Sequence, residues 1–144
     1  MSIYHLDSIF RPRRIAVVGA SDDPSSVGFA VFRNLKRSFE GELVPVNPSR
    51  REVAGVAAFP SVCDIGHRPD LAVVCTPART VASVIESCGE AGVPGAVVIS
   101  AGFRERGPEG KALEADVMRA ARRFEGLRIV GPNCLGVIVP RSGL

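Results

Sequence analysis

The sequence predicts one α/β domain, built in three layers around a doubly wound, mostly parallel sheet and spanning residues 1–144. Short apolar runs that suit buried strands alternate with stretches whose apolar residues recur every three or four positions, as in amphipathic helices. The first apolar run ends abruptly in Gly19 and a loop of small polar residues. The length suffices for one hydrophobic core and is short for two, and no internal repeat is present.

Six apolar segments are predicted to be strands, separated by glycine, proline and charged residues. The run at 71–75 is unbroken and bounded by Asp70 and Thr76, so both of its faces should be covered. The piece at 53–59 contains Gly55 and is predicted to be a weak strand or a bend. The predicted strands are 15–18, 43–46, 53–59, 71–75, 96–99 and 127–130, the last of them as an inner strand.

Helices are predicted between these strands. The apolar residues of 27–35 share one helix face directly after the glycine loop. Pro77 and Pro108 each open a further helix at its first position, because the first helical turn does not use the N–H group that proline lacks. Short apolar turns are expected within 6–12 and 61–65. Strands that alternate with helices at this spacing imply right-handed crossovers and a Rossmann-like architecture.

Composition disfavours several classes of partner. The net charge is only +3, the 18 basic residues are scattered, and one Tyr and no Trp are present, which is not typical of a nucleic-acid binder. No apolar run approaches the roughly 20 residues of a membrane span, and the first ten residues do not resemble a secretory signal. We therefore expect no membrane association and a cytoplasmic location.

The four cysteines are not spaced as a disulfide framework or a zinc site. Cys75 lies in an apolar run and Cys88 on the apolar stripe of a helix, so both are predicted to be small core residues. Cys63 and His67 could share a helix face, but two ligands without others nearby make a poor metal site. No metal is expected in this chain.

Candidate ligand-binding residues follow the predicted strands, because ligands of such sheets collect at the carboxyl ends of the strands. The backbone N–H groups at the helix start after Gly19 lack intrahelical partners and favour an anionic phosphate. Five small, polar or proline-fixed loops should meet at this edge and bind a nucleotide-like ligand. The predicted binding residues are Gly19, Ala20, Ser21, Ser25, Ser26, Val27, Gly28, Asn47, Pro48, Arg50, Thr76, Pro77, Ser100, Ala101, Gly102, Asn133 and Cys134.

The glycine loop departs from the fingerprint of NAD-binding proteins. That fingerprint is Gly-x-Gly-x-x-Gly, with an acidic residue about 20 positions later for the ribose 2′-hydroxyl. This chain has Ser21 and Pro24 at the second and third glycine positions, and Asn47 ends the second strand. Arg50 instead stands where a cation could bind a ribose phosphate, which occurs in NADP and in coenzyme A. Alternatively, Arg50 and Arg51 form a solvated turn.

The order of six short motifs resembles the coenzyme A-binding domain of NDP-forming acyl-CoA synthetases, which is related to the α subunit of succinyl-CoA synthetase. The resemblance covers nearly the whole chain. The motifs are Leu6-Asp7-Ser8-Ile9-Phe10-Arg11-Pro12, Val17-Val18-Gly19-Ala20-Ser21, Pro45-Val46-Asn47-Pro48, Asp70-Leu71-Ala72-Val73-Val74, Ser100-Ala101-Gly102-Phe103 and Gly131-Pro132-Asn133-Cys134-Leu135-Gly136.

This resemblance implies that coenzyme A is the cofactor and that the loop 19–28 holds it. Arg50 matches a basic residue of the family, often Lys, that contacts a phosphate of the coenzyme. The Thr76-Pro77 turn would line the coenzyme pocket, and Asn133-Cys134 would face the active centre. Cys134 is not expected to be a nucleophile, because no His in the sequence is an obvious base for it.

The resemblance further implies that the domain is the N-terminal part of an acid-thiol ligase, which makes an acyl-CoA from an acid, coenzyme A and ATP. The family passes phosphate through a histidine in a following domain, whereas this chain has only His5 and His67, in no matching motif. The chain alone is therefore expected to bind coenzyme A without catalysing. ATP or ADP and Mg²⁺ would act only in the parent enzyme, with the remaining ligase domains or a partner subunit.

Two alternatives stay open from the sequence. One is a non-catalytic module that senses coenzyme A or acyl-CoA and is fused to an acyltransferase or another effector, since it would use the same pocket. The other is an NADP-binding domain, against which the missing second and third glycines argue.

Overall fold

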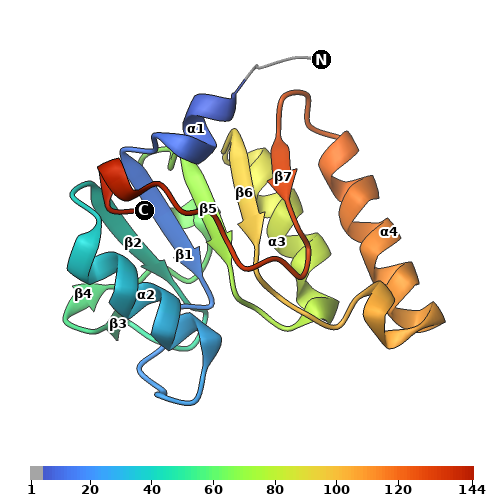
Figure 1. Cartoon of the computed structure of the whole chain (residues 1–144), viewed down its shortest axis with the longest axis horizontal. Coiled ribbons are helices and arrows are strands. Elements are labelled where there is room, and N and C mark those ends of the chain that lie inside the picture. The colour runs from blue at the N-terminus through green and yellow to red at the C-terminus, as the bar shows by residue number, and fades with distance from the viewer. Residues whose placement is uncertain (1–4) are drawn as a thin grey trace.

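Five parallel strands form one sheet in the order β2-β1-β5-β6-β7 (Figure 1). The structure, a computed structural model, describes residues 5–144. The chain adds β2 on one side of β1 and β5 on the other, so the strand order reverses between β1 and β5. The strands are β1 (Arg14–Val18), β2 (Glu42–Val46), β5 (Leu71–Val74), β6 (Gly95–Val98) and β7 (Arg128–Val130).

Helices cover both faces of this sheet, which confirms the predicted three-layer, Rossmann-like fold. Successive strand residues point to opposite faces. Ile15 and Val17 therefore belong to a core with Phe32 of α2, whereas Ala16 and Val18 belong to a second core with helices α3 and α4. All four residues of β5 are buried, as its unbroken apolar run predicts. The long helices are α2 (Val27–Ser38), α3 (Ala78–Glu90) and α4 (Pro108–Arg122).

The chain after β7 turns back and crosses the face of the sheet that α2 covers (Figure 1). Val137 and Leu144 pack against the core on that face. The Ser38 hydroxyl at the end of α2 donates a 2.7 Å hydrogen bond to the carbonyl of Gly143. The segment 131–144, which ends in the short turn η3 (Pro140–Ser142), therefore completes the layer beside α2.

The segment 53–59, predicted as a weak strand or a bend, contains both. Its first residues belong to a separate antiparallel hairpin, whose turn places Ala54 and Gly55 at φ values of +48° and +79°, and Phe59 forms a parallel bridge with Val46. Two other sequence predictions need correction. β7 is an edge strand rather than an inner one, because the following segment crosses the sheet instead of adding a strand. Pro77 is the N-cap of α3, so the helix begins one residue later. The hairpin strands are β3 (Glu52–Val53) and β4 (Val56–Ala57).

The short turns are largely as predicted. The structure has a helical turn α1 (Leu6–Phe10) and a 3₁₀ turn η1 (Val62–Asp64) at the two expected places. A further turn, η2 (Arg104–Arg106), precedes α4 and was not predicted. No helix within residues 5–144 combines the length and apolar character needed to cross a membrane.

Candidate functional site

The carboxyl ends of β2, β1 and β5 are tied together by backbone hydrogen bonds. The N–H of Gly19 donates to the carbonyl of Val46 over 2.9 Å, and the N–H of Cys75 donates to the carbonyl of Val18 over 2.8 Å. These bonds extend the sheet by one residue past each strand. The loops that follow therefore leave the sheet from fixed points.

The glycine loop is packed so closely that side chains would not fit at two positions. Gly19 has φ +91°, and a Cβ there would lie 3.1 Å from the methyl group of Thr76. A Cβ on Gly28, in the first turn of α2, would lie 1.8 Å from the carbonyl oxygen of Gly19. The side-chain amide of Asn47 donates a 2.8 Å hydrogen bond to the carbonyl of Ala20. The start of α2 is thus held directly against the end of β1.

Two serines of this loop use their hydroxyl protons within the loop. Ser26 caps α2 by accepting from the N–H of Phe29 over 3.1 Å, and it donates to the carbonyl of Asp23 over 2.9 Å. Ser25 donates to the Asp23 carboxylate over 2.7 Å, and this bond is the main cause of the lowered pKa of Asp23. The Ser21 hydroxyl accepts from the N–H of Asp23. The hydroxyls of Ser25 and Ser26 therefore present lone pairs to a ligand, whereas the Ser21 hydroxyl keeps its proton for donation.

A cavity of about 460 Å³ opens at the ends of β1, β2 and β5, where the strand order reverses. This is the position at which doubly wound sheets bind their ligands. Five of the predicted binding residues line it: Gly19, Asn47, Pro48, Thr76 and Pro77. The other lining residues are Val18, Val46, Pro60, Ser61, Val62, Cys75, Thr80, Ser83, Val84 and Ser87.

One wall of this cavity, formed by a face of helix α3, was not predicted from the sequence. Thr80, Ser83 and Ser87 of α3 line the cavity, at a spacing that places them on one side of a helix. Each hydroxyl donates to a backbone carbonyl three or four residues earlier. The Thr80 hydroxyl donates to Pro77 over 2.8 Å, that of Ser83 to Thr80 over 2.9 Å, and that of Ser87 to Ser83 over 3.1 Å. Their lone pairs remain available, so this wall can accept hydrogen bonds from a ligand. The i, i+3, i+7 spacing of hydroxyls beside the apolar stripe is visible in the sequence, but it has the pattern of a solvated helix face.

Thr76 contributes a polar atom that lacks a partner. Its Oγ1 is buried and makes no hydrogen bond to any residue that the structure describes. A buried hydroxyl without a partner is costly, so such an atom in a cavity wall indicates a place where a ligand or water completes the bonding. This makes Thr76 the clearest indication of ligand binding in the cavity.

Arg50 lies beside the glycine loop and is not among the residues that line the cavity. Its Nη1 is 3.5 Å from Oδ2 of Asp22, and both side chains are close to half exposed. The other carboxylate oxygen of Asp22 accepts a 2.9 Å hydrogen bond from the N–H of Ala54, in the turn of the β3–β4 hairpin. Asp22 was not predicted as a site residue, although it is adjacent to the predicted Ser21.

The predicted residues after β6 and β7 form a second group at the same edge. The N–H of Asn133 donates to the carbonyl of Ser100 over 3.0 Å. The Ser100 hydroxyl donates to the carbonyl of Val74, and the Cys134 thiol to the carbonyl of Val98. These contacts join the two loops to each other and to the sheet, but they do not bring them into the cavity at β1, β2 and β5.

The thiol of Cys75 is not suited to act as a nucleophile. Burial, with a smaller contribution from the neighbouring Cys134, raises its pKa to about 12. The thiolate is the reactive form, so Cys75 stays protonated and unreactive at neutral pH. Within residues 5–144, no three His, Cys, Asp or Glu side chains gather as a metal ion would require.

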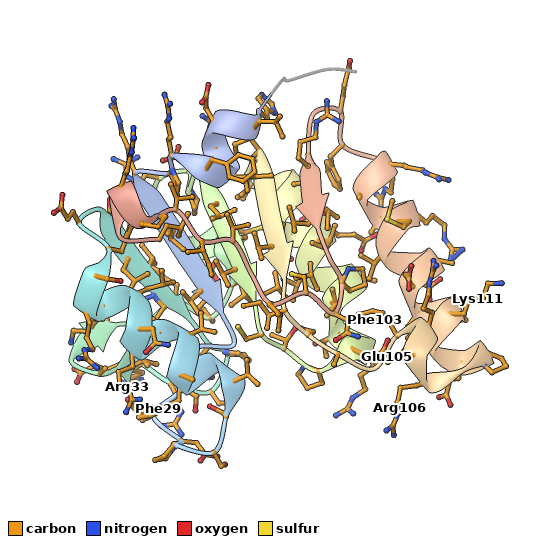
Figure 2. All side chains as sticks on the ribbon, viewed as in Figure 1. Phe29, Arg33, Phe103, Glu105, Arg106 and Lys111 are labelled. Atoms are coloured by element: carbon orange, nitrogen blue, oxygen red, sulfur yellow. The ribbon has the colours of Figure 1, made fainter. Side chains whose placement is uncertain are left out.

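Gly102 borders a separate hollow of about 430 Å³. Arg79 of α3 and Arg106 of η2 also line it. Glu105 accepts a hydrogen bond from the N–H of Gly102, which lowers the pKa of its carboxyl group. Figure 2 shows Phe103, Glu105 and Arg106 together at this edge of the sheet. Ala101, the remaining predicted residue of this loop, is exposed.

Comparison with known proteins gives a consistent result. Residues 13–140 match the model of the CoA binding domain family. The chain is 45% identical over 139 residues to the α subunit of an ADP-forming acetate–CoA ligase from Pyrococcus furiosus, and 39% identical over 130 residues to an ADP-forming 4-hydroxybutyrate–CoA ligase from Nitrosopumilus maritimus. These alignments cover 96% and 90% of this chain.

A solved structure agrees in fold. The dinucleotide-forming acetyl-coenzyme A synthetase 1 of Candidatus Korarchaeum cryptofilum, in complex with phosphate and ADP, superimposes with a TM-score of 0.90 and 41% sequence identity. The match covers 96% of this chain and 30% of that one. The chain likewise spans 30% of the Pyrococcus furiosus relative and 18% of the Nitrosopumilus maritimus relative.

Proposed function

The chain belongs to the family of CoA binding domains, and from this we propose that it holds coenzyme A across the carboxyl edge of its sheet for an acid-thiol ligase. The observation that carries the proposal is the cavity where the strand order reverses. Gly19, the first residue of the glycine loop, lines this cavity, and the buried Thr76 hydroxyl in its wall has no partner within residues 5–144. An adenosine diphosphate with an attached thiol arm suits a polar-edged cavity beside a helix start.

We assign the binding roles as follows. The loop 19–28 binds phosphate through the N–H groups of Val27 and Gly28 in the first turn of α2, because these N–H groups lie at the positive end of the helix dipole. Arg50 binds the 3′-phosphate of the ribose through charge-assisted hydrogen bonds. Thr76 and the cavity bind uncharged polar groups of the coenzyme. The loops at Ser100–Gly102 and Asn133-Cys134 extend the site along the sheet edge.

The chemistry of the ligase is assigned to other parts of the parent protein. The two histidines of this chain lie away from the proposed site: His67 Nε2 is 2.8 Å from Glu42 at the start of β2, and His5 Nδ1 is 2.7 Å from the carbonyl of Gly126, before β7. Both positions are at the amino edge of the sheet. We therefore propose that ATP or ADP, Mg²⁺ and phosphate transfer belong to the remaining ligase domains, and that the parent enzyme works in the cytoplasm.

The proposal is tested by calorimetry with coenzyme A, 3′-dephospho-coenzyme A and NADP. Coenzyme A should bind more tightly than the other two ligands. Arg50→Ala should weaken the binding of coenzyme A by about 1.5–3 kcal/mol, the contribution of a charge-assisted contact. The binding of dephospho-coenzyme A should change little. Arg51→Ala removes a neighbouring exposed cation and is the matched control. Binding of NADP without binding of coenzyme A at millimolar concentration would refute the proposal.

A further inference from the structure

Arg50 faces carboxylates of the glycine loop in the structure. Its Nη1 lies 3.5 Å from Oδ2 of Asp22. Its positive charge also contributes to the lowered pKa of Asp23, after the two hydrogen bonds from Ser25. The cation proposed to bind the ligand phosphate is therefore already in contact with one carboxylate and within electrostatic range of a second.

Asp22 is held in place from its other side. Its Oδ1 accepts the hydrogen bond from the N–H of Ala54, and the carbonyl of Ala54 accepts a hydrogen bond from the ammonium group of Lys36 on α2. The hairpin turn is thus attached both to the glycine loop and to the helix. The Asp22 carboxylate cannot turn away from Arg50 without giving up its bond to the hairpin.

The contact between Asp22 and Arg50 is weak enough to be replaced. At 3.5 Å it is an ion pair, longer than the 2.7–2.9 Å of charge-assisted hydrogen bonds. An arginine offers five N–H donors in a planar fork, and a phosphate dianion can take two of them in parallel. A phosphate can therefore bind to Arg50 more strongly than the fixed carboxylate does, although the nearby carboxylate repels that phosphate and weakens its binding.

From this geometry we infer that Asp22 is a built-in competitor, which occupies Arg50 and lowers the affinity of the site for the 3′-phosphate. The inference rests on the proposed function, in which Arg50 binds the 3′-phosphate of coenzyme A. A fixed carboxylate beside Arg50 repels the 3′-phosphate and must be displaced from the guanidinium when that phosphate binds. Asp22 thereby keeps the affinity for coenzyme A below the value that Arg50 alone would give.

The test compares Asp22→Asn with the wild-type chain in calorimetric titrations with coenzyme A and 3′-dephospho-coenzyme A. Asparagine keeps the oxygen that accepts from Ala54, so the hairpin stays attached while the charge is lost. The variant should bind coenzyme A roughly 3–10-fold more tightly at low salt and dephospho-coenzyme A less than about twofold more tightly. The gain should shrink at high salt, where exposed charges are screened. Asp116→Asn, which alters an exposed ion pair with Arg119 on α4, is the matched control and should change neither affinity.

Two results would overturn the inference. Unchanged affinity for coenzyme A would show that the carboxylate does not compete, and weaker binding would show that Asp22 positions Arg50 instead. Thermal unfolding of the variant checks that the hairpin is intact. Failure of the proposed function would look different, because the wild-type chain itself would then not bind coenzyme A, or Arg50→Ala would leave its affinity unchanged.

Discussion

The close approach of α2 to the end of β1 can be tested with the substitution Gly28→Ala. A Cβ at position 28 would lie 1.8 Å from the carbonyl oxygen of Gly19 and 2.8 Å from its carbonyl carbon. Both atoms belong to backbone that is held in the sheet, since the N–H of Gly19 bonds to the carbonyl of Val46. The helix start and the strand end must therefore separate by about an ångström or more.

The cost follows from two opposing effects. Overpacking of a well-ordered contact costs about 1–3 kcal/mol, and a clash with backbone belongs at the upper end of that range. Alanine returns about 1 kcal/mol through its better helix propensity than glycine. The free energy of unfolding should thus fall by roughly 1–2 kcal/mol, which lowers the melting temperature by about 2–8 °C for a chain of this size.

Binding should fall with it. The displaced helix start carries the amides proposed to bind phosphate. The loss of about one hydrogen bond to the ligand should lower the affinity for coenzyme A about tenfold. Gly66→Ala is the control, because Gly66 has nothing within 4 Å of the added methyl group and no positive φ. That variant should be neutral or slightly stabilised. If Gly28→Ala melts and binds like Gly66→Ala, the glycine loop is not held by this contact.

Two further predictions concern Thr76 and the buried thiols. Thr76→Val removes a buried hydroxyl without a described partner, so the free energy of unfolding measured in urea should rise by about 1 kcal/mol. Coenzyme A should bind to this variant several-fold more weakly. Thr80→Val is the control, because it removes the bond to the Pro77 carbonyl and should lower the free energy of unfolding by about 0.5–1.5 kcal/mol. A stability loss in Thr76→Val would contradict this assignment. Burial raises the pKa of both Cys75 and Cys88 to about 12 from 9.0. Above pH 9 the unfolded chain loses these protons and the folded chain keeps them, so stability is intact below pH 9 and should fall towards pH 12 by about 1.4 kcal/mol per pH unit for each thiol. Cys88→Ala should remove the contribution of one thiol to this dependence of stability on pH. An unchanged dependence would contradict the raised pKa of Cys88.

Features encoded by neighbouring residues were predictable. The apolar run that ends at Gly19, followed by the helical spacing of 27–35, specifies a strand, a tight turn and a helix, and the structure has all three. The two short turns near Leu6 and Val62 were predicted from equally local patterns. The resemblance of ordered motifs gave the CoA binding domain, which the family match confirms. The binding roles of individual residues remain predictions.

Features set by tertiary contacts were not predictable. The edge position of β7 depends on where the segment 131–144 runs, and no local pattern describes that path. Asp22 looks like one of several polar loop residues until the hairpin brings Ala54 and Arg50 to it. The hydroxyls of α3 have the pattern of a solvated helix face, and only the fold shows that a cavity lies beside them.

The connection from β2 to β5 explains why that cavity exists. The crossover between two parallel strands of one sheet usually contains a helix that packs on the sheet, and β2 and β5 are such strands, with β1 between them. Residues 47–70 instead contain the β3–β4 hairpin and the single turn η1. The hairpin is attached on the glycine-loop side, and η1 lies against α3, where the Cys63 thiol donates to the carbonyl of Ser87 over 3.4 Å. The volume that a full helix would fill is left open between Val62 and α3, directly above the ends of β1 and β5. The short crossover thus leaves space for the ligand. Its η1 turn forms the wall of the cavity that faces α3, and its hairpin supplies Ala54, whose N–H bonds to Asp22.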